Sequence, residues 1–176
     1  MTMWVFGYGS LLWNPGINVA EKVLASLSGY ARSFCMRSIH HRGSDEKPGL
    51  VLALDQTLNA YCNGVVLRVM TEDEDNALSY LRERELISSA YVEKMLDVTL
   101  LDGRVVTALT YVVDPEHVQY CGGLPLEEQA QIIAKAWGGR GANSEYLYKT
   151  ASQLHKMGVA DKELDWLVSR VAALSS

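Results

Sequence analysis

The sequence is poor in three features that mark large classes of protein: cysteine, long apolar runs and basic charge. Its three cysteines, Cys35, Cys62 and Cys121, are odd in number and widely spaced, which argues against a disulfide framework and favours the reducing cytoplasm. No stretch approaches the eighteen consecutive apolar residues of a membrane-spanning helix. The first residues also lack the basic and apolar segments of a signal peptide. We therefore expect a cytoplasmic protein that does not insert into a membrane.

Basic residues are outnumbered by acidic ones, 16 against 21, which gives a net charge of -5. Binding to nucleic acid needs a basic face, so we expect no nucleic-acid partner. The four histidines (His40, His41, His117 and His155) show no spacing typical of a zinc site. His117 and Cys121 together would supply only two ligands, so we expect no bound metal.

The composition that remains is that of an ordinary globular protein, with 48% hydrophobic and 21% charged residues. The chain has no internal repeat and no linker-like stretch. Its 176 residues fit a single domain over residues 1–176 with one sizeable core.

The most informative segment is a short apolar strand that ends in a glycine turn. Val5 and Phe6 lead into Gly7-Tyr8-Gly9-Ser10, and apolar residues resume at Leu11. Two glycines that flank one residue allow consecutive N–H groups to converge on an anion or an oxyanion. A dinucleotide-binding loop would need a third glycine where Leu12 stands, and a phosphate-binding Walker loop would need a lysine. A plain strand-to-loop turn is the alternative interpretation.

The pattern along the chain is rich in strands at first and helical in the last third. We expect strands at residues 5–6, 50–54, 64–69, 91–101 and 105–113, with a hairpin turn at Asp102-Gly103. We expect helices at residues 71–85, 126–137, 143–157 and after 161. This order fits an α+β fold in which a mixed, partly closed β-barrel is surrounded by helices.

Four capping signals support the helix boundaries. Thr71 and Glu74 have the spacing of a capping box at the first helix. Asn143 is expected to cap the N-terminus of a later helix that Gly158 ends, and Asp161 is expected to cap the last one.

Glu85 is the candidate catalytic residue. It lies four residues after Leu81 and seven after Leu78, on the apolar side of the helix at residues 71–85. A carboxylate on an apolar face is costly unless it is paired, so we expect its pKa to rise, as a general base near neutral pH requires. In the alternative, Glu85 is solvated in a frayed last turn, or pairs with Arg84 or Lys94.

Three further side chains are candidates for contact with a ligand. Arg42 is a cation that can bind a carboxylate, with a structural salt bridge or a solvated loop as the alternative. Tyr111 and Tyr146 can donate hydrogen bonds to a substrate, although a core tyrosine is the default for both.

Four segments, in order along the chain, resemble one family. They are Phe6-Gly7-Tyr8-Gly9-Ser10-Leu11 with Trp13, Ser38 to Gly43 with Lys47-Pro48-Gly49 (S-x-x-H-R-G and K-P-G), Tyr80-Leu81 with Arg84-Glu85, and Gly141 to Leu147 (G-x-N-x-E-Y-L). This set resembles the ChaC-like, glutathione-specific γ-glutamylcyclotransferases over nearly the whole chain. The one departure is Leu86 to Tyr91, where the family often has glycine.

The resemblance implies the γ-glutamylcyclotransferase fold and a cofactor-free lyase. Such an enzyme closes the γ-glutamyl group of glutathione into 5-oxoproline and releases Cys-Gly. Glu85 would be the general acid/base. The residues expected to bind substrate are Val5, Phe6, Gly7, Tyr8, Gly9, Ser10, Leu11, Arg42 and Tyr146.

Three alternatives remain open. The substrate can be a γ-glutamyl amino acid or γ-glutamylamine, since the glycine loop and one glutamate serve both. A non-catalytic small-molecule-binding domain of the same fold is the second. The third is a Cys/His hydrolase, although no cysteine lies in an activating motif. The oligomeric state does not follow from the sequence.

Overall fold

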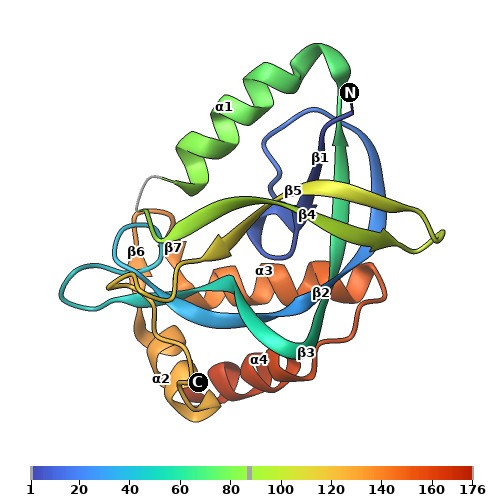
Figure 1. Ribbon diagram of the computed structural model, residues 1–176. Helices are drawn as coiled ribbons and strands as arrows, with labels where there is room; N and C mark the ends of the chain where they lie inside the picture. The colour runs from blue at the N-terminus through green and yellow to red at the C-terminus, as the bar shows by residue number, and fades with distance from the viewer. Residues whose placement is uncertain (1, 87–88, 176) are drawn as a thin grey trace. The chain divides into compact units, whose positions relative to one another are not determined.

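The computed structural model describes residues 2–86 and 89–175 (Figure 1). Its helices and strands are, in chain order, β1 (Trp4–Gly7), η1 (Ser10–Leu12), β2 (Val19–Ser38), β3 (Gly49–Val69), η2 (Thr71–Asp73), α1 (Glu74–Glu85), β4 (Tyr91–Leu100), β5 (Val105–Val113), α2 (Leu126–Lys135), β6 (Trp137–Gly138), β7 (Gly141–Ala142), α3 (Asn143–Lys156) and α4 (Lys162–Ser175). Among the described residues, no helix has both the length and the apolar character needed to cross a membrane.

The chain divides into two compact units, and β2 and β3 pass through both. The first unit contains Met1–Arg32 and Leu54–His117, and the second contains Ser33–Ala53 and Val118–Ser176. A single domain over residues 1–176 stays a prediction.

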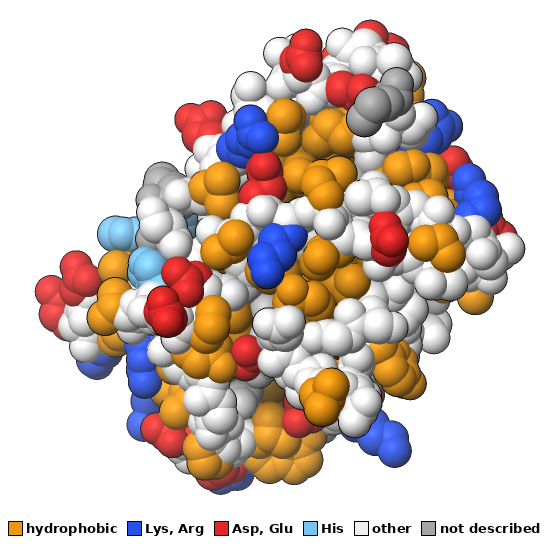
Figure 2. All heavy atoms as spheres, in the orientation of Figure 1, with side chains coloured by type: hydrophobic (Ala, Val, Ile, Leu, Met, Phe, Trp, Pro, Cys, Tyr) orange, Lys and Arg blue, Asp and Glu red, His pale blue; other side chains and the backbone are white. Residues whose placement is uncertain are grey.

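Lys and Arg side chains are scattered among acidic and apolar ones on the face drawn in Figure 2.

Five strands close into a barrel in the order β1-β3-β2-β4-β5. β1 runs antiparallel to β3 and parallel to β5, so the sheet is mixed. β4 and β5 form a hairpin in which Tyr91 pairs with Val113 and Thr99 with Val105. The turn of this hairpin has Gly103 at a φ of +92°, a left-handed conformation that favours glycine. The predicted α+β fold, its closed mixed sheet and the Asp102-Gly103 turn are therefore confirmed.

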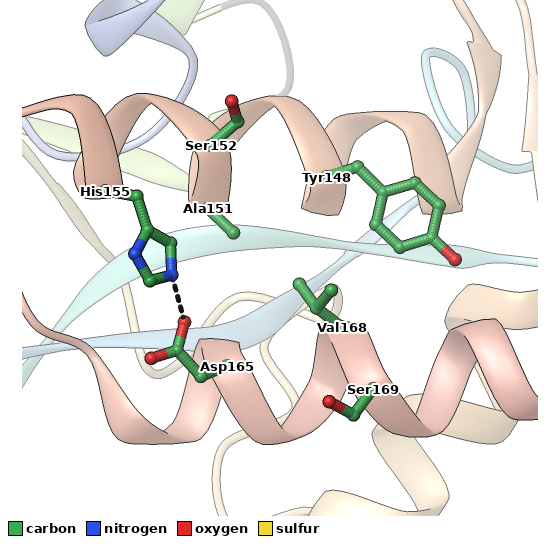
Figure 3. Close-up of a pocket in the computed structure, with 7 residues that line it drawn as sticks. All are labelled: Tyr148, Ala151, Ser152, His155, Asp165, Val168 and Ser169. Carbon is green, nitrogen blue, oxygen red and sulfur yellow. Dashed lines mark hydrogen bonds and ion pairs between the residues drawn. The ribbon is translucent and has the colours of Figure 1, made fainter.

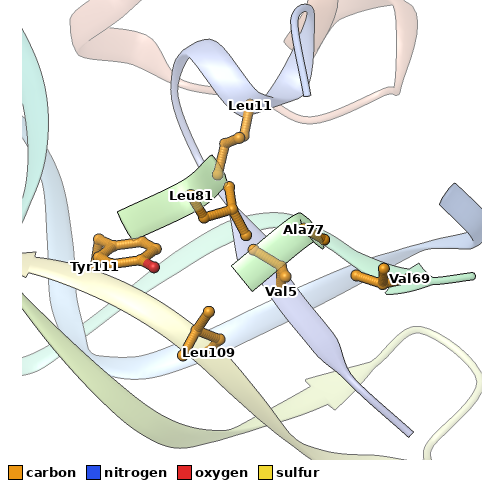
Figure 4. Packing of buried hydrophobic residues seen from close by; sticks show 7 residues of the cluster. All are labelled: Val5, Leu11, Val69, Ala77, Leu81, Leu109 and Tyr111. Atoms are coloured by element: carbon orange, nitrogen blue, oxygen red, sulfur yellow. The ribbon is translucent and has the colours of Figure 1, made fainter. Parts of the chain in front are cut away.

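In the first unit, α1 attaches to the barrel through one apolar face. Ala77 and Leu81 of α1 pack with Val5 of β1 and with Leu109 and Tyr111 of β5 (Figure 4). Burying side chains of this size stabilises the contact by roughly 1.5–3 kcal/mol for each large aliphatic group. This packing confirms the predicted inner face of the helix and fixes the direction of its last turn.

Two expectations about strands were wrong. No strand was expected over residues 19–38, yet β2 occupies all of them. Its signal is a weak alternation, in which buried Ala25 and Leu27 are separated by the less buried Ser26, and pairing with two neighbouring strands decides the conformation. The segments 50–54 and 64–69 were expected to be separate, but they belong to the one strand β3, which contains Asn59 at a φ of +64°.

The predicted capping box is also absent from the start of α1. Residues Thr71–Asp73 form the 3-10 turn η2, and no side chain caps either this turn or α1. Glu74 instead accepts a hydrogen bond from the backbone N–H of Met3 at 3.3 Å. The carboxylate of Glu74, which the local pattern assigned to the start of the helix, is thus bound by the backbone of Met3, far away in the sequence.

The second unit contains α2, α3 and α4, which pack through buried apolar stripes. Ile133 of α2, Leu147 of α3 and Leu167 of α4 are almost fully buried. α2 ends at Lys135 rather than at residue 137, because Trp137 and Gly138 form β6, which pairs with β7.

Of the caps expected in the second unit, two are confirmed and one is wrong. Gly158 follows α3 at a φ of +74°, and Oδ1 of Asp161 accepts from the N–H of Leu164 at 3.1 Å. Ala142 stands at the cap position of α3, and Asn143 is the first residue of the helix. The side chain of Asn143 is occupied elsewhere, by the backbone of Leu50.

Candidate functional site

The glycine loop leaves β1 and turns at once into η1. The N–H of Leu12 donates to the carbonyl of Gly9 at 2.9 Å, and the N–H of Asn14 donates to the carbonyl of Ser10 at 2.7 Å. Among the described residues, none is seen to accept a hydrogen bond from the N–H of Gly9 or Ser10. These two donors come before the first bonds of the turn, as N–H groups at the start of a helical turn commonly do.

Gly7 stands where β1 ends and leaves little room for a side chain, because the chain passes close to its neighbours there. A Cβ at this position would lie 3.3 Å from Cβ of Leu11 and 3.3 Å from Cγ2 of Val65. The side chains of Val5, Phe6 and Leu11 are buried. Contact between these three residues and a substrate would therefore run through their backbone.

Tyr8 is held in place at both its side chain and its backbone. Its hydroxyl donates to the carbonyl of Tyr111 at 3.0 Å, and its ring stacks on Phe6 with the centroids 6.3 Å apart. The guanidinium of Arg32 donates to the carbonyl of Tyr8 at 3.1 Å and to that of Asn63 at 2.9 Å. The position of the loop is thus set by β2, β3 and β5.

Glu85 lies at the last residue of α1 and is largely shielded, with 16% of its side chain exposed. Nε of Arg84 is 3.4 Å from its Oε1. The partly buried position agrees with the helix face on which the sequence places Glu85. The pairing with Arg84 is one of the alternatives that the sequence leaves open, while a fully solvated side chain is not what the structure shows.

Arg84 connects the end of α1 to the glycine loop. Its side chain is only 7% exposed. One terminal nitrogen donates to Oγ of Ser10 at 2.7 Å, and the other donates to the carbonyls of Asn14 at 2.6 Å and Pro15 at 3.3 Å. The guanidinium therefore lies between the loop and the carboxylate of Glu85.

A second polar chain lies beside this one, on β4 and β5. The hydroxyl of Tyr111 donates to Oε1 of Glu93 at 2.9 Å. The guanidinium of Arg82 on α1 donates two hydrogen bonds to the same carboxylate, at 3.1 and 3.0 Å. Two arginines of α1 thus each pair with a different carboxylate: Arg82 with Glu93 of β4, and Arg84 with Glu85 of α1 itself.

Burial and charge shift the pKa values of this chain in opposite directions. Desolvation raises the pKa of the Tyr111 phenol well above its usual range, and the hydrogen bond to Glu93 and the charges of Glu93 and Glu85 add to this effect. The bonds from Arg82, and then from Tyr111, lower the pKa of Glu93. We conclude that Tyr111 is a neutral donor and Glu93 an anion at neutral pH.

Arg42 and Tyr146 belong to the second unit, where they contact each other. The guanidinium carbon of Arg42 lies 5.8 Å from the ring centroid of Tyr146. Arg42 donates to the carbonyl of Ala142 at 3.0 Å and lies 3.4 Å from Oε2 of Glu145, while the hydroxyl of Tyr146 accepts from the N–H of Leu52 at 3.1 Å. Their predicted role in substrate binding stays a prediction.

A pocket of about 430 Å³ lies in the second unit between α3 and α4 (Figure 3). Its lining is formed by Tyr148, Ala151, Ser152, His155, Asp165, Val168 and Ser169. His155 and Asp165 form an exposed pair in it, with Nε2 and Oδ1 2.8 Å apart. None of the residues predicted from the sequence to act on a substrate lines this pocket.

Metal and thiol chemistry find little support in the part of the chain that the structure describes. There, no three His, Cys, Asp or Glu side chains are grouped so as to hold a metal ion. Cys35 and Cys62 are buried, and burial raises the pKa of the Cys121 thiol. A raised pKa disfavours the thiolate that a nucleophilic cysteine needs.

Comparison with known proteins decides the family. A family model described as ChaC-like protein matches residues 3–174. The chain belongs to the ChaC-like family. It is 36% identical over 172 residues to the glutathione-specific gamma-glutamylcyclotransferase of Escherichia coli (strain K12), a match that covers 98% of this chain and 74% of that relative.

Two further similarities extend this result. The ChaC-like chain is 33% identical over 176 residues to glutathione-specific gamma-glutamylcyclotransferase 1 of Homo sapiens, covering 98% of this chain and 79% of that relative. Its fold matches a crystal structure of the gamma-glutamyl cyclotransferase specific to glutathione from yeast with a TM-score of 0.87, at 24% identity and over 100% of both chains. The predicted family and fold are both confirmed.

Sequence reasoning did not find Glu93, nor the contacts that join Arg84 to the glycine loop. Glu93 falls in an alternating strand segment, where nothing in the pattern separates it from the other polar positions. Arg84 was expected as part of a motif and as an alternative partner of Glu85, but its contacts with the loop were not expected. Tyr80, one helical turn earlier, contacts it, with the hydroxyl 3.4 Å from the guanidinium.

Proposed function

We propose that this protein is a cofactor-free γ-glutamylcyclotransferase that acts on glutathione in the cytoplasm. Its products would be 5-oxoproline and Cys-Gly. Membership of the ChaC-like family and the names of relatives that match nearly the whole chain support this proposal. The observation that carries it is the single guanidinium of Arg84 that contacts both Ser10 of the glycine loop and Glu85.

In the proposed reaction the substrate supplies both the nucleophile and the electrophile. The α-amino nitrogen of the γ-glutamyl group forms a bond to its own γ-carbonyl carbon, which closes a five-membered lactam. The bond from that carbon to the amide nitrogen of cysteine breaks. One proton leaves the attacking nitrogen and one reaches the leaving nitrogen, so that Cys-Gly departs as an amine.

Glu85 is proposed as the group that moves this proton. A carboxylate shielded from water at the end of α1 takes the proton from the attacking amine and returns it to the leaving nitrogen. The N–H groups of Gly9 and Ser10 are proposed to bind the γ-carbonyl oxygen as negative charge develops on it, or the α-carboxylate. Holding the flexible γ-glutamyl arm in a folded shape would supply much of the acceleration.

Binding of the rest of the substrate is assigned by proposal to the residues that the family resemblance indicates. Val5, Phe6, Gly7 and Leu11 would contribute through their backbone, and Tyr8 through its ring. Arg42 is proposed to bind a carboxylate of glutathione and Tyr146 to donate a hydrogen bond. Since Arg42 already contacts Glu145 and Ala142, a purely structural role for it is the competing interpretation.

A second candidate substrate class is the γ-glutamyl amino acids. The same loop and glutamate serve both classes, because the reacting group is the same. The first experiment incubates the purified protein with millimolar glutathione and, separately, with γ-Glu-Ala, and detects 5-oxoproline by mass spectrometry. Cys-Gly from glutathione alone supports the proposal. Turnover of γ-Glu-Ala alone would assign the γ-glutamyl amino acids as the substrate class. If neither substrate yields 5-oxoproline, the proposal that the protein is an enzyme is overturned.

A further inference from the structure

Arg84 makes more contacts than a surface ion pair requires. Its guanidinium bonds Ser10, Asn14 and Pro15 of the loop that follows β1, and the same group lies 3.4 Å from the carboxylate of Glu85. The side chain is 7% exposed, whereas Arg82, two residues earlier on the same helix, is 53% exposed. Arg84 is therefore a buried cation whose partners lie on two elements far apart in sequence.

We propose that Arg84 is a positioning residue, which holds the glycine loop and the carboxylate of Glu85 at a fixed separation. The proposal rests on the function assigned above. Arg84 does not need to touch the substrate. It sets where the N–H groups of Gly9 and Ser10 lie relative to the group that moves the proton.

The chemistry of the guanidinium suits this task. It is planar, always charged, and carries five N–H donors in a rigid fork, so it satisfies several acceptors at fixed angles. The carbonyls of Asn14 and Pro15 and the hydroxyl of Ser10 all accept from its two terminal nitrogens, while Nε faces Glu85. The ammonium of a lysine is a point charge and would reach only part of this set.

The packing of α1 explains why such a link matters. Ala77 and Leu81 fix the helix against β1 and β5, but both lie upstream of Glu85, which is the last residue of the helix. The apolar packing sets the helix axis, and Leu86, just past the end of the helix, packs against the same cluster, so the last turn is held by this contact together with polar ones. Arg84 supplies the polar contacts to the loop, and a shift of about 1 Å in such a geometry can cost on the order of 10²-fold in rate.

The test combines four variants with kinetics on the substrate that the wild-type protein turns over; one of them, Arg84→Ala, leaves space for added guanidinium ion. Arg84→Met keeps much of the side-chain length and removes the charge and all five donors. Arg84→Lys keeps only the charge. Ser10→Ala removes one partner, whose side chain carries a single hydroxyl. Arg170→Met is the control for loss of an arginine, because Arg170 pairs with Glu127 on the exposed surface of the second unit.

For Arg84→Met we expect kcat to fall by roughly 10²-fold with KM little changed, because the residue sets geometry rather than binding substrate. Arg84→Lys should recover part of this loss. Added guanidinium ion at millimolar, non-denaturing concentration should restore part of kcat to Arg84→Ala. Ser10→Ala and Arg84→Met should be non-additive when combined, since they remove the same contact. Arg170→Met should keep the wild-type kcat.

Wild-type kinetics in Arg84→Met would overturn the inference. So would a loss in kcat for Arg84→Met that is fully additive with that of Ser10→Ala, together with no recovery of kcat in Arg84→Ala when guanidinium ion is added. If Arg84→Met does not fold, Arg84→Lys and Ser10→Ala decide, and wild-type kcat in both counts against the proposal. If the wild-type protein is inactive on every γ-glutamyl substrate, the proposed function itself fails. If the wild type is active but the Arg84 variants behave like it, only the positioning role of Arg84 fails.

Discussion

Tyr111 and Glu93 stand directly opposite each other on β5 and β4, and the hydroxyl of the tyrosine donates a 2.9 Å hydrogen bond to the carboxylate. Because cross-strand partners lie on one face of a sheet, the pair is present wherever this hairpin keeps its register. Arg82 of α1 closes the set with two bonds to Glu93. The hydrogen bond of the buried Tyr111 hydroxyl therefore depends on the register of β4 and β5, and the set that it belongs to depends on the placement of α1.

Replacing Tyr111 by Phe tests this link. The ring that packs against Leu81 is kept, and only the hydroxyl that donates to Glu93 is lost. We expect the free energy of unfolding to fall by about 1.5–3 kcal/mol, the range for a hydrogen bond to a charged group. Urea unfolding followed by circular dichroism measures it. Tyr61→Phe, at a side chain that is 66% exposed, is the matched control and should change stability by less than about 0.5 kcal/mol.

The pH dependence of stability should report Glu93. The bonds from Arg82 and Tyr111 lower its pKa in the folded protein below the ordinary value of 4.5. A group with a depressed pKa contributes stability that is fully present above its unfolded value and is lost as pH falls through the folded value. We therefore expect wild-type stability to fall below about pH 4.5.

Several other carboxylates, Glu21, Asp102, Glu127 and Glu145, also have lowered pKa values, so their protonation in acid adds to the loss of stability. The contribution of Glu93 is therefore the difference between the wild type and Glu93→Gln, measured by urea unfolding at steps from pH 7 to pH 3. This difference should be largest at pH 7 and should shrink as the solution becomes more acidic. A difference that is constant over the range would contradict the assignment.

Asn143 offers a stability prediction in the second unit. Its side chain is fully buried, with Oδ1 accepting from the N–H of Leu50 and Nδ2 donating to the carbonyl of the same residue, both at 2.8 Å. Asn143→Ala leaves both backbone groups of Leu50 without these partners, so we expect a loss of about 2–4 kcal/mol. Asn143→Asp keeps the acceptor only and should fall short of the wild type. Thermal unfolding measures both, with the exposed Asn76→Ala as control.

The sequence predicted those parts of the fold whose conformation depends on a few residues close together in the chain. The glycine turn after β1, the Asp102-Gly103 hairpin and the apolar face of α1 were all found, because each depends on a few neighbouring residues. The capping role expected for Asn143 was wrong for the opposite reason. Its amide binds Leu50, 93 residues earlier, and no local pattern distinguishes such a partner from a cap.

The candidate site divides in the same way. Helical spacing placed Glu85 on the side of Leu81, and its partial burial agrees with that spacing, whereas its choice as the catalytic candidate also needed the family resemblance and stays a prediction. The contact between Arg84 and Ser10 spans 74 residues and depends on how α1 lies against β1. Glu93 depends on the β4–β5 register. Both need the assembled barrel, so neither was accessible from periodicity.

Glu85→Gln is the sharpest test of the chemistry, because it removes the ionisable group and keeps the shape of the side chain. We expect kcat to fall by roughly 10²–10⁴-fold, the usual contribution of a general acid/base, while the thermal midpoint stays close to that of the wild type. Glu83→Gln is the matched control, since Glu83 lies on the same helix two residues earlier and is exposed. It should keep wild-type turnover.

Each outcome of this pair has a definite meaning. A loss confined to Glu85→Gln, with 5-oxoproline measured by mass spectrometry, supports the proton-transfer role. Wild-type turnover in Glu85→Gln would falsify that role and turn attention to the loop, since cyclisation would then depend on substrate positioning by Gly9 and Ser10 alone. Equal losses in both variants would assign the effect to the last turn of α1 as a whole, because only a general disturbance of that turn reaches both side chains.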